Sequence, residues 1–410
     1  MARLLFLAHR LPYPPNKGDK VRSYHLLRHL TQRHQVYLGT FVDDPEDLRH
    51  VATLRAMCAG VHAVDLSPRM ARICSLRGLA TGEALSLPYY RDAGLQSWVV
   101  DTCRSNAIDV AVIFSSAMAQ YVEAMPGRAT LVDFVDVDSA KWSQYADAHR
   151  WPMSWLYRRE GRKLLSFERK VAARSARSYF VTQSEADLFR DLAPECADRV
   201  SVMSNGVDAD YFSPAHDLDS PFGLDEVPVV FTGAMDYWPN IDAVTWFAAD
   251  VLPALRARRP EVRFHIVGRA PAPSVVAVAG DAVVVSGTVP DVRPYLRHAA
   301  AVVAPLRVAR GIQNKILEAM AMGRPVVVSE ACAGAIDSGA VRELVVARDA
   351  PAFVDAIDEL LSDRERAERL GERGRQAVVA RYSWTAHLSA IDNLIDSLAV
   401  RSGAPVRVAA

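Results

Sequence analysis

The chain lacks an excess of charge of either sign, because 48 lysines and arginines balance 48 aspartates and glutamates among its 410 residues. It has no overall basic field to neutralise a phosphate backbone, which argues against a dedicated nucleic-acid-binding protein. Cysteine is scarce as well: the five cysteines are far apart in sequence and odd in number. They form no closely spaced metal-binding pair, and this usage is typical of the reducing cytoplasm rather than of a disulfide-bonded scaffold.

Long hydrophobic runs are also missing. No uncharged apolar stretch approaches the roughly 20 residues that a membrane-spanning helix requires. The apolar run at 4–8 ends at His9 and Arg10 and is shorter than the core of a secretory signal. We therefore expect a cytoplasmic chain without a transmembrane helix, either free or peripheral on the inner face of the cytoplasmic membrane.

What the sequence does contain is a regular alternation of short β-rich runs with helical patterns. Continuous apolar strands separated by helices indicate parallel sheets that are covered on both faces. The sequence thus predicts an α/β protein with two doubly wound, Rossmann-like domains facing across a cleft. Strands are expected at 4–8, 36–41, 110–114, 130–135, 229–232, 264–267, 283–286, 301–304 and 325–329, and helices at 19–31, 241–258 and 312–322.

The alternation restarts after 205–208, and a turn-rich stretch at 211–226 is interpreted as a linker. The predicted limits are 1–205 for an N-terminal, acceptor-side domain and 206–380 for a C-terminal, nucleotide-sugar-binding domain. A helix in 381–410 is expected to pack back on the N-terminal domain and to end in a tail.

The most informative segment is 309–330. Lys315 and Glu318 are three residues apart on a helix that is predicted to begin at Gly311, so they share one face of it. Free backbone N–H groups at the start of a helix bind anions. A cation near a diphosphate and a carboxylate that accepts from ribose hydroxyls would suit a nucleotide. An exposed Lys–Glu pair would produce the same pattern.

Together with other segments, this stretch resembles the nucleotide-sugar signature of the family 4 retaining glycosyltransferases, which have the GT-B fold. Two N-terminal segments resemble one branch, the sugar transferases associated with exosortase and PEP-CTERM exopolysaccharide systems; they are HRLPYPPNKGDKVRSYHLLRHL (9–30) and VDFVDVDSAKWSQYA (132–146). The C-terminal matches are LEAMAMGRPVV (317–327), SNGVDADYFSP (204–214), VVFTGAMDYWPNIDAV (229–244), FHIVGR (264–269) and VSGTVPDVRPYL (285–296).

The resemblance implies a retaining glycosyltransferase that moves a sugar from a nucleotide-diphosphate-sugar donor to a saccharide or lipid-linked acceptor. It implies no metal and no cofactor, since the nucleotide sugar is a substrate. Glu318 would contact the ribose, and Lys315 is the candidate catalytic cation. The other implied donor-binding residues are Gly233 near the diphosphate, Arg269 after the glycine of the second strand, and Thr288 and Val289 at the base. Arg307, Arg310, Gly311 and Ile312 complete the implied set.

The sequence also departs from the family pattern. Arg310 stands where the family has its first glutamate, so the usual carboxylate contact to the donor sugar is missing. Ala234 and 236–240 replace the basic pair that commonly holds the diphosphate. Lys315, Arg307 and Arg310 are the candidate substitutes for that pair.

On the acceptor side, the resemblance points to Lys17 and Gly18 in the loop after the first strand. Asp136 and Asp138 follow the strand at 130–135, where Asp133 also lies, and we take both as candidate catalytic residues that hydrogen-bond sugar or acceptor hydroxyls. Read alone, Asp136-Val137-Asp138 resembles the metal-binding Asp-x-Asp of the other glycosyltransferase fold. Ordinary loop and cap aspartates are the remaining alternative.

Two further patterns have structural alternatives. His25 and His29 have a helical spacing that can bind metal, but no third ligand is near in sequence, so we expect no metal there. The stretch 149–178 holds nine lysines and arginines against Glu160 and Glu168, with aromatic residues between them. It is interpreted either as a contact with an anionic membrane or as a surface helix that packs Leu164, Leu165, Val171 and Ala172 inward.

Two other functions remain compatible with these motifs. A sugar-nucleotide 2-epimerase has the same fold and would convert a nucleotide sugar without an acceptor. A degenerate scaffold in a polysaccharide assembly complex would bind nucleotide without turnover. The base, the sugar, the acceptor and the oligomeric state are not specified by the sequence.

Overall fold

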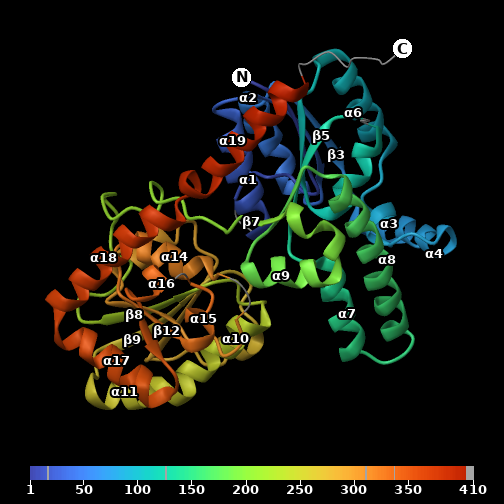
Figure 1. Cartoon of the computed structure of the whole chain (residues 1–410). Coiled ribbons are helices and arrows are strands. Elements are labelled where there is room, and N and C mark those ends of the chain that lie inside the picture. The colour runs from blue at the N-terminus through green and yellow to red at the C-terminus, as the bar shows by residue number, and fades with distance from the viewer. Residues whose placement is uncertain (16–17, 125–126, 310–311, 337, 403–410) are drawn as a thin grey trace, which may run out of the picture. The chain divides into compact units, whose positions relative to one another are not determined.

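The computed structural model describes residues 1–15, 18–124, 127–309, 312–336 and 338–402. This part of the chain divides into two compact units (Figure 1). The N-terminal unit comprises Met1–Ser204 and the residues from Leu388 onward, and the C-terminal unit comprises Asn205–His387. Each unit has its own parallel sheet, which confirms the predicted α/β class with two Rossmann-like domains.

In the N-terminal unit, seven strands of the described chain pair in parallel in the order β3-β2-β1-β4-β5-β6-β7. The strand order reverses between β1 and β4, and the carboxyl ends of strands at such a point border the binding crevice of an open α/β sheet. The strands are β1 (Arg3–Ala8), β2 (Gln35–Val42), β3 (Gly60–Asp65), β4 (Val110–Phe114), β5 (Ala129–Val135), β6 (Arg177–Phe180) and β7 (Val200–Val202).

The helices of this unit cover the sheet with apolar side chains. One core cluster stacks the rings of Phe134, Phe180 and Phe189, with centroids 4.8–5.6 Å apart. The helices are α1 (Gly18–Thr31), α2 (Val51–Met57), α3 (Pro68–Ser75), α4 (Arg77–Thr81), α5 (Ser86–Tyr89), α6 (Ala93–Asn106), α7 (Asp138–Ala148), α8 (Met153–Arg174) and α9 (Gln183–Leu192), together with the last part of α19 (Trp384–Ser402).

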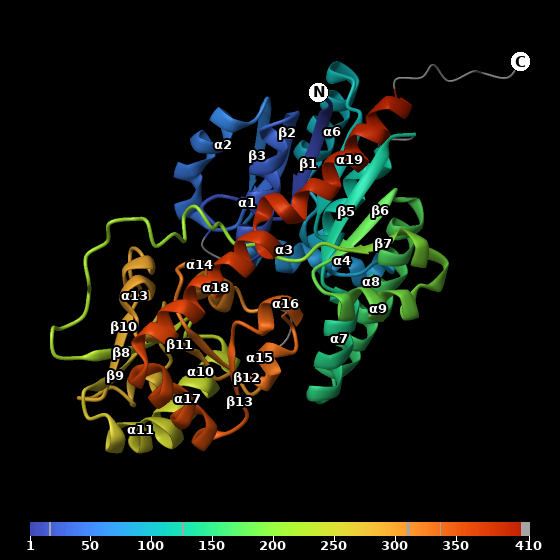
Figure 2. The ribbon, with the colours of Figure 1, turned by 60° about the vertical axis from the view of Figure 1, so that its left-hand side comes forward.

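The C-terminal unit repeats this plan with six strands among the described residues, in the order β10-β9-β8-β11-β12-β13 (Figure 2). The order reverses between β8 and β11, so the loops that follow these two strands border the second binding crevice. The strands are β8 (Val227–Thr232), β9 (Val262–Val267), β10 (Val283–Gly287), β11 (Ala301–Ala304), β12 (Val326–Ser329) and β13 (Val345–Ala347).

One helix of the C-terminal unit is less regular than predicted. The helix expected at 241–258 is two helices joined by a π-helical turn at Phe247–Val251, because Pro253 has no backbone N–H to continue the regular pattern. The helices are α10 (Trp238–Trp246), α11 (Leu252–Arg258), α12 (Pro273–Val276), α13 (Arg293–His298), α14 (Asn314–Ala321), α15 (Glu330–Ala333), α16 (Ser338–Val341), α17 (Ala350–Ser362) and α18 (Arg364–Tyr382).

All nine strands expected from sequence are present within about two residues of their predicted limits. Four strands that the sequence analysis did not predict complete the sheets. They are β3, β7 and β13 at sheet edges and β6 next to an edge.

Candidate functional site

Two glycines hold the loops after β8 and β9 in contact. A Cβ atom on Gly268 would lie 1.6 Å from the carbonyl oxygen of Gly233, so no other residue fits there without moving the backbone. Gly233 donates its N–H to Val267, and Gly268 donates to Gly287 at the end of β10. These contacts join the carboxyl ends of β8, β9 and β10. Gly233 leaves backbone without a side chain at the end of β8, the strand that borders the reversal of strand order.

Lys315 lies against this surface. Its Nζ donates to Asn240 Oδ1 at 2.6 Å and stands 4.1 Å from the centroid of the Phe231 ring. The amide of Asn240 is in turn fixed, because its Nδ2 donates to the carbonyl of Ala234. Gly233 leaves room for the ammonium, since a Cβ atom there would come within 3.0 Å of Nζ.

Burial sets the ionisation of this helix face. Lys315 is only 9% exposed, and desolvation lowers the pKa of its ammonium to about 7. Glu318, one turn further along α14, is half-buried, and desolvation raises the pKa of its carboxyl to about 7 against the favourable field of Lys315. An anion placed beside Lys315 would restore its charge, so the pair is suited to bind a ligand that carries phosphate and hydroxyl groups.

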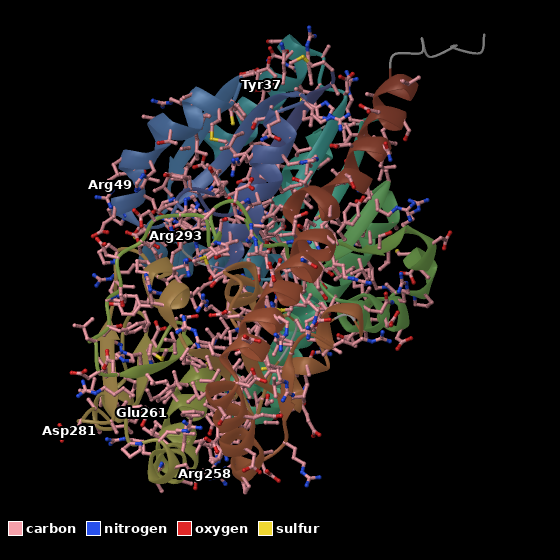
Figure 3. All side chains as sticks on the ribbon, turned by 90° about the vertical axis from the view of Figure 1, so that its left-hand side faces the viewer. Tyr37, Arg49, Arg258, Glu261, Asp281 and Arg293 are labelled. Atoms are coloured by element: carbon pink, nitrogen blue, oxygen red, sulfur yellow. The ribbon has the colours of Figure 1, made fainter. Side chains whose placement is uncertain are left out.

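Tyr211 and Arg293 lie near the same helix face. The Arg293 guanidinium, labelled in Figure 3, stacks over the Tyr211 ring at 3.9 Å and donates hydrogen bonds to both carboxylate oxygens of Asp291. The carboxylate of Glu318 contributes to the field at Tyr211. These residues lie next to the segment where the resemblance places the nucleobase, and the sequence analysis did not select any of them.

The other donor-side residues differ in their exposure to solvent and in their contacts. Arg307 is exposed and its Nε donates to Asp242 at 2.9 Å, so it is already engaged in an ion pair. Arg269 and Thr288 are exposed, and Val289 and Ile312 are half-buried against the apolar core. Arg310 and Gly311 lie outside the described residues.

The start of helix α14 differs from the prediction. It begins at Asn314 instead of Gly311, because Gln313 has an extended backbone conformation with φ −85° and ψ 109°. Lys315 and Glu318 remain within the helix, so the correction leaves their shared face intact.

In the N-terminal unit, the loop after β1 carries a network of charges. Arg10 donates to Asp19 Oδ2 at 2.6 Å and to Asp43 Oδ2 at 2.8 Å, and His9 Nε2 lies 3.4 Å from Asp19. Burial alone would raise the pKa of Asp19, but His9 and Arg10 outweigh it and hold that pKa well below its usual range. Gly18 is the exposed first residue of α1, and Lys17 lies outside the described residues.

Asp136 and Asp138 are both bound by a residue that the sequence analysis did not select. Lys141 Nζ lies 2.7 Å from Asp136 Oδ2 and 3.1 Å from Asp138 Oδ1, where Asp138 is the first residue of α7. Desolvation opposes the charge of Lys141, yet the two carboxylates raise its pKa above the ordinary value. Val135 turns the chain here with φ 69°, an uncommon conformation for a β-branched residue.

Asp133, within β5, has a different partner from this pair. It is buried within the unit, where Arg22 Nε donates to Oδ2 at 2.7 Å and Arg22 Nη2 donates to Oδ1 at 3.0 Å. Desolvation raises the pKa of Asp133 although Arg22 opposes the shift. The ion pair joins α1 to β5 and is structural.

The two histidines with metal-like spacing contact protein groups. His29 Nε2 lies 2.9 Å from Asp392 Oδ1 in α19, and Arg33 donates to the other oxygen of Asp392 at 2.7 Å. His25 packs edge-on against Tyr24. Within the described residues, no group of three or more His, Cys, Asp or Glu side chains is arranged to hold a metal ion.

Only some of the charged side chains in the basic stretch 149–178 are exposed to solvent. Within α8, Arg159, Glu160 and Glu168 are buried together with Leu164 and Ala172, while Arg158, Arg162 and Lys163 are exposed. None of the helices in the described parts of the chain is sufficiently long and apolar to span a membrane.

Comparison with known proteins identifies the region that carries the Lys315–Glu318 face. Residues 226–363 match the family model described as "Glycosyl transferases group 1". The matched region runs from the start of β8 to the end of α17 and includes Gly233, Lys315 and Glu318, while Tyr211 precedes it.

Sequence similarity extends to a curated relative. The chain is 32% identical over 214 residues to "Phosphatidyl-myo-inositol mannosyltransferase" of Mycobacterium leprae. This match spans 50% of the chain and 56% of the relative, so the chain spans about half the length of the curated relative it matches.

Solved structures match over nearly the whole chain. Sucrose-phosphate synthase from Thermosynechococcus elongatus has a TM-score of 0.68 at 17% identity, covering 98% of this chain and 100% of that one. Anabaena Alr3699/HepE in complex with UDP-glucose has a TM-score of 0.64 at 15% identity, covering 97% of this chain and 100% of that one. These neighbours are GT-B glycosyltransferases, so the fold comparison agrees with the predicted GT-B class.

Proposed function

We propose that the protein is a retaining, metal-independent glycosyltransferase that uses a nucleotide-diphosphate sugar as its donor. The observation that carries the proposal is the buried Lys315–Glu318 face of α14 beside the Gly233–Gly268 contact. Two comparisons support it. Residues 226–363 match the group 1 glycosyl transferases, and the chain has a fold similar to that of HepE, which was solved in complex with UDP-glucose.

In this proposal the side chains of the C-terminal unit stabilise the leaving diphosphate. Lys315 stands beside the bare backbone of Gly233, where a diphosphate oxygen would replace Asn240 as its partner. The charge on that oxygen grows as the bond to the anomeric carbon breaks, so a preorganised cation stabilises the transition state more than the ground state. Glu318 accepts hydrogen bonds from the ribose hydroxyls, which do not change during transfer.

In a retaining reaction, the anomeric C–O bond to phosphate breaks while a C–O bond to the acceptor forms on the same face of the sugar. The acceptor hydroxyl proton passes to the departing phosphate oxygen, so the step requires no protein base. We propose that Asp136 and Asp138, oriented by Lys141, hydrogen-bond sugar or acceptor hydroxyls. Lys17 and Gly18 complete the acceptor side of the proposal.

The biological setting is the finer part of the proposal. The two N-terminal segments that resemble exosortase-associated transferases support a saccharide or lipid-linked acceptor in exopolysaccharide or cell-surface glycan synthesis. Such an acceptor would place the protein at the inner face of the cytoplasmic membrane.

The test is a thermal-shift screen of UDP-, GDP- and ADP-sugars, followed by turnover with the donor that stabilises the protein. UDP-glucose is the first candidate because HepE binds it. Lys315→Ala should lower kcat by about a hundredfold or more, the scale for losing one preorganised charged donor. Glu318→Ala should mainly weaken donor binding. Conversion of the nucleotide sugar without an acceptor, or binding without any turnover, would contradict the proposal.

A further inference from the structure

The outer face of α3 and α4 is unusually apolar and basic. Met70, Ile73, Leu76 and Leu79 are 58%, 61%, 54% and 43% exposed, within a stretch of ten residues. Arg69, Arg72 and Arg77 are exposed between them, and no aspartate or glutamate occurs from 66 to 82. We call these seven side chains the α3–α4 face.

This arrangement is the reverse of what packing within a monomer favours. The two helices turn their small residues inward, because Ala71, Ser75 and Gly78 are buried while the large apolar side chains point to the outside. A helix that only covers a protein core buries its largest apolar side chains and exposes polar ones. The α3–α4 face is therefore shaped for contact with something outside the unit.

Buried charges of α8 fix these helices in place. Arg159 Nη2 donates to the carbonyl of Gly78 at 2.6 Å. Glu160 accepts from the backbone N–H of Leu85 at 2.6 Å and of Ser86 at 3.0 Å, immediately after α4. The face is thus a preformed surface, and its exposure does not result from a loosely held loop.

The exposed basic side of α8 extends this surface. Lys163 Nζ is the nearest atom to the position of a Cβ on Gly82, at 3.8 Å, and Gly82 directly follows α4. Arg162 is exposed next to Lys163 on the same helix. Figure 1 shows α3 and α4 beside α8 at the margin of the N-terminal unit.

We propose that the α3–α4 face binds the surface of an anionic lipid bilayer. The apolar side chains enter the boundary between headgroups and acyl chains, and the arginines with Arg162 and Lys163 contact the anionic headgroups. A second copy of the chain is a poorer occupant, because pairing two such faces would bring arginines opposite arginines. This inference goes beyond the proposed transferase activity, and vesicle binding is measured without any donor or acceptor.

The experiment uses the full chain with vesicles of neutral phosphatidylcholine and of phosphatidylcholine mixed with phosphatidylglycerol. The wild type should sediment with the anionic vesicles, less so at high salt, and only weakly with the neutral ones. Replacing three charges with Arg69→Glu, Arg72→Glu and Arg77→Glu should weaken the binding by about a hundredfold. Ile73→Ser with Leu79→Ser should weaken it by about tenfold or more.

Matched controls come from the C-terminal unit. Leu224→Ser removes a fully exposed apolar side chain, and Arg348→Glu reverses an exposed arginine outside the α3–α4 face. Both should bind anionic vesicles as the wild type does. The thermal shift with UDP-glucose should be equal in all variants and the wild type, which separates loss of membrane binding from loss of folding or of donor binding.

Several outcomes would overturn the proposal. Wild-type binding that is equal for neutral and anionic vesicles, or absent for both, removes the anionic bilayer as the partner. Loss of binding only with Trp151→Ser and Trp155→Ser would place the contact at the exposed tryptophans around the start of α8 instead. A change from dimer to monomer in the Ile73→Ser, Leu79→Ser variant, without an effect on vesicles, would assign the face to self-association.

Discussion

At the scale of single residues, Lys315 and Glu318 should couple donor binding to protons in opposite directions. The pKa of Lys315 is lowered by burial to about 7, so above that pH the side chain is mostly neutral until an anionic diphosphate raises its pKa. Donor binding should then take up a proton at pH 8. The pKa of Glu318 is raised by burial to about 7, and ribose hydroxyls that donate to its carboxylate lower it again. Donor binding should therefore release a proton at pH 6.

Calorimetric titration with UDP-glucose in buffers of different ionisation enthalpy measures this exchange. Uptake at pH 8 should disappear in Lys315→Ala, and release at pH 6 should disappear in Glu318→Gln. If both variants exchange the same number of protons as the wild type, these two residues do not contact the donor.

The residues of the site were only partly accessible to prediction from the sequence. The spacing of Lys315 and Glu318 predicted that they share a helix face. Gly233 and the ribose role of Glu318 were expected only from the resemblance of their segments to the glycosyltransferase pattern. Asn240 lies 75 residues from the lysine it binds, and nothing local marks it as a partner. Lys141 was missed although it is close in sequence, because its role depends on how Val135 turns the chain after β5.

At the scale of elements, the contact between the loops after β8 and β9 should be required for donor binding. In Gly268→Ala the new Cβ atom would collide with the carbonyl oxygen of Gly233, so the two loops must separate. We expect donor affinity to fall by about tenfold or more, together with a lower Tm, the size expected when a backbone contact at a binding site is forced apart.

Gly280→Ala is the matched control, because a Cβ atom there meets nothing within 4 Å. It should leave the affinity for UDP-glucose unchanged. Equal affinities in Gly268→Ala and the wild type would show that the contact does not shape the donor site.

The buried end of α8 should make the stability of the N-terminal unit depend on pH. Glu168 receives a hydrogen bond from Ser139 Oγ at 2.5 Å, and burial raises the pKa of its carboxyl to about 8. The folded state therefore binds more protons than the unfolded state between about pH 4 and pH 8, so stability falls as the pH rises through this window. The slope from this group approaches about 1.4 kcal/mol per pH unit.

Glu168→Gln has nearly the same shape and no ionisable proton, so it should remove this slope. Urea denaturation at pH 5, 6.5 and 8 gives the free energy of unfolding for both proteins. The wild type should lose stability relative to the variant at each step. Parallel curves would mean that Glu168 is ionised in the folded state at a pH close to its ordinary value.

The strands that could be predicted from the sequence occupy different positions in the sheets from those that could not. Strands in the middle, such as β1, β4, β8 and β11, are buried on both faces and give continuous apolar runs. The strands β7 and β13 have only three residues each and lie at edges, and the side chains of β3 are only half-buried. Their patterns are short and mixed, so hydrophobicity alone does not separate them from loops.

At the scale of the whole molecule, the presence of two similar domains could be predicted because the alternation of strands and helices starts again after 205–208. Such alternation specifies parallel pairing, because each strand needs a crossover helix before the next parallel strand. The order of the strands, and hence the points where it reverses, depends on tertiary packing. The positions of the two switch points, between β1 and β4 and between β8 and β11, were therefore available only from the structure.

The proposed reaction as a whole should proceed without a divalent metal ion. The charge that grows on the leaving diphosphate is assigned to Lys315, whose ammonium donates a hydrogen bond to the neutral amide of Asn240. Both carboxylates of the acidic pair that resembles a metal-binding Asp-x-Asp already contact the ammonium of Lys141, at 2.7 Å and 3.1 Å. A metal ion at Asp136 and Asp138 would have to displace this lysine and overcome its charge.

We therefore expect turnover with the donor found in the screen to be unchanged by EDTA. Lys141→Met tests the reason, because it frees both carboxylates without adding a charge. In that variant, manganese should become able to bind at Asp136 and Asp138, while the wild type should bind none by calorimetry. Loss of wild-type turnover on chelation, with recovery on addition of manganese but not of sodium chloride at equal ionic strength, would show that the diphosphate is held by a metal ion and that Lys315 is not its main partner.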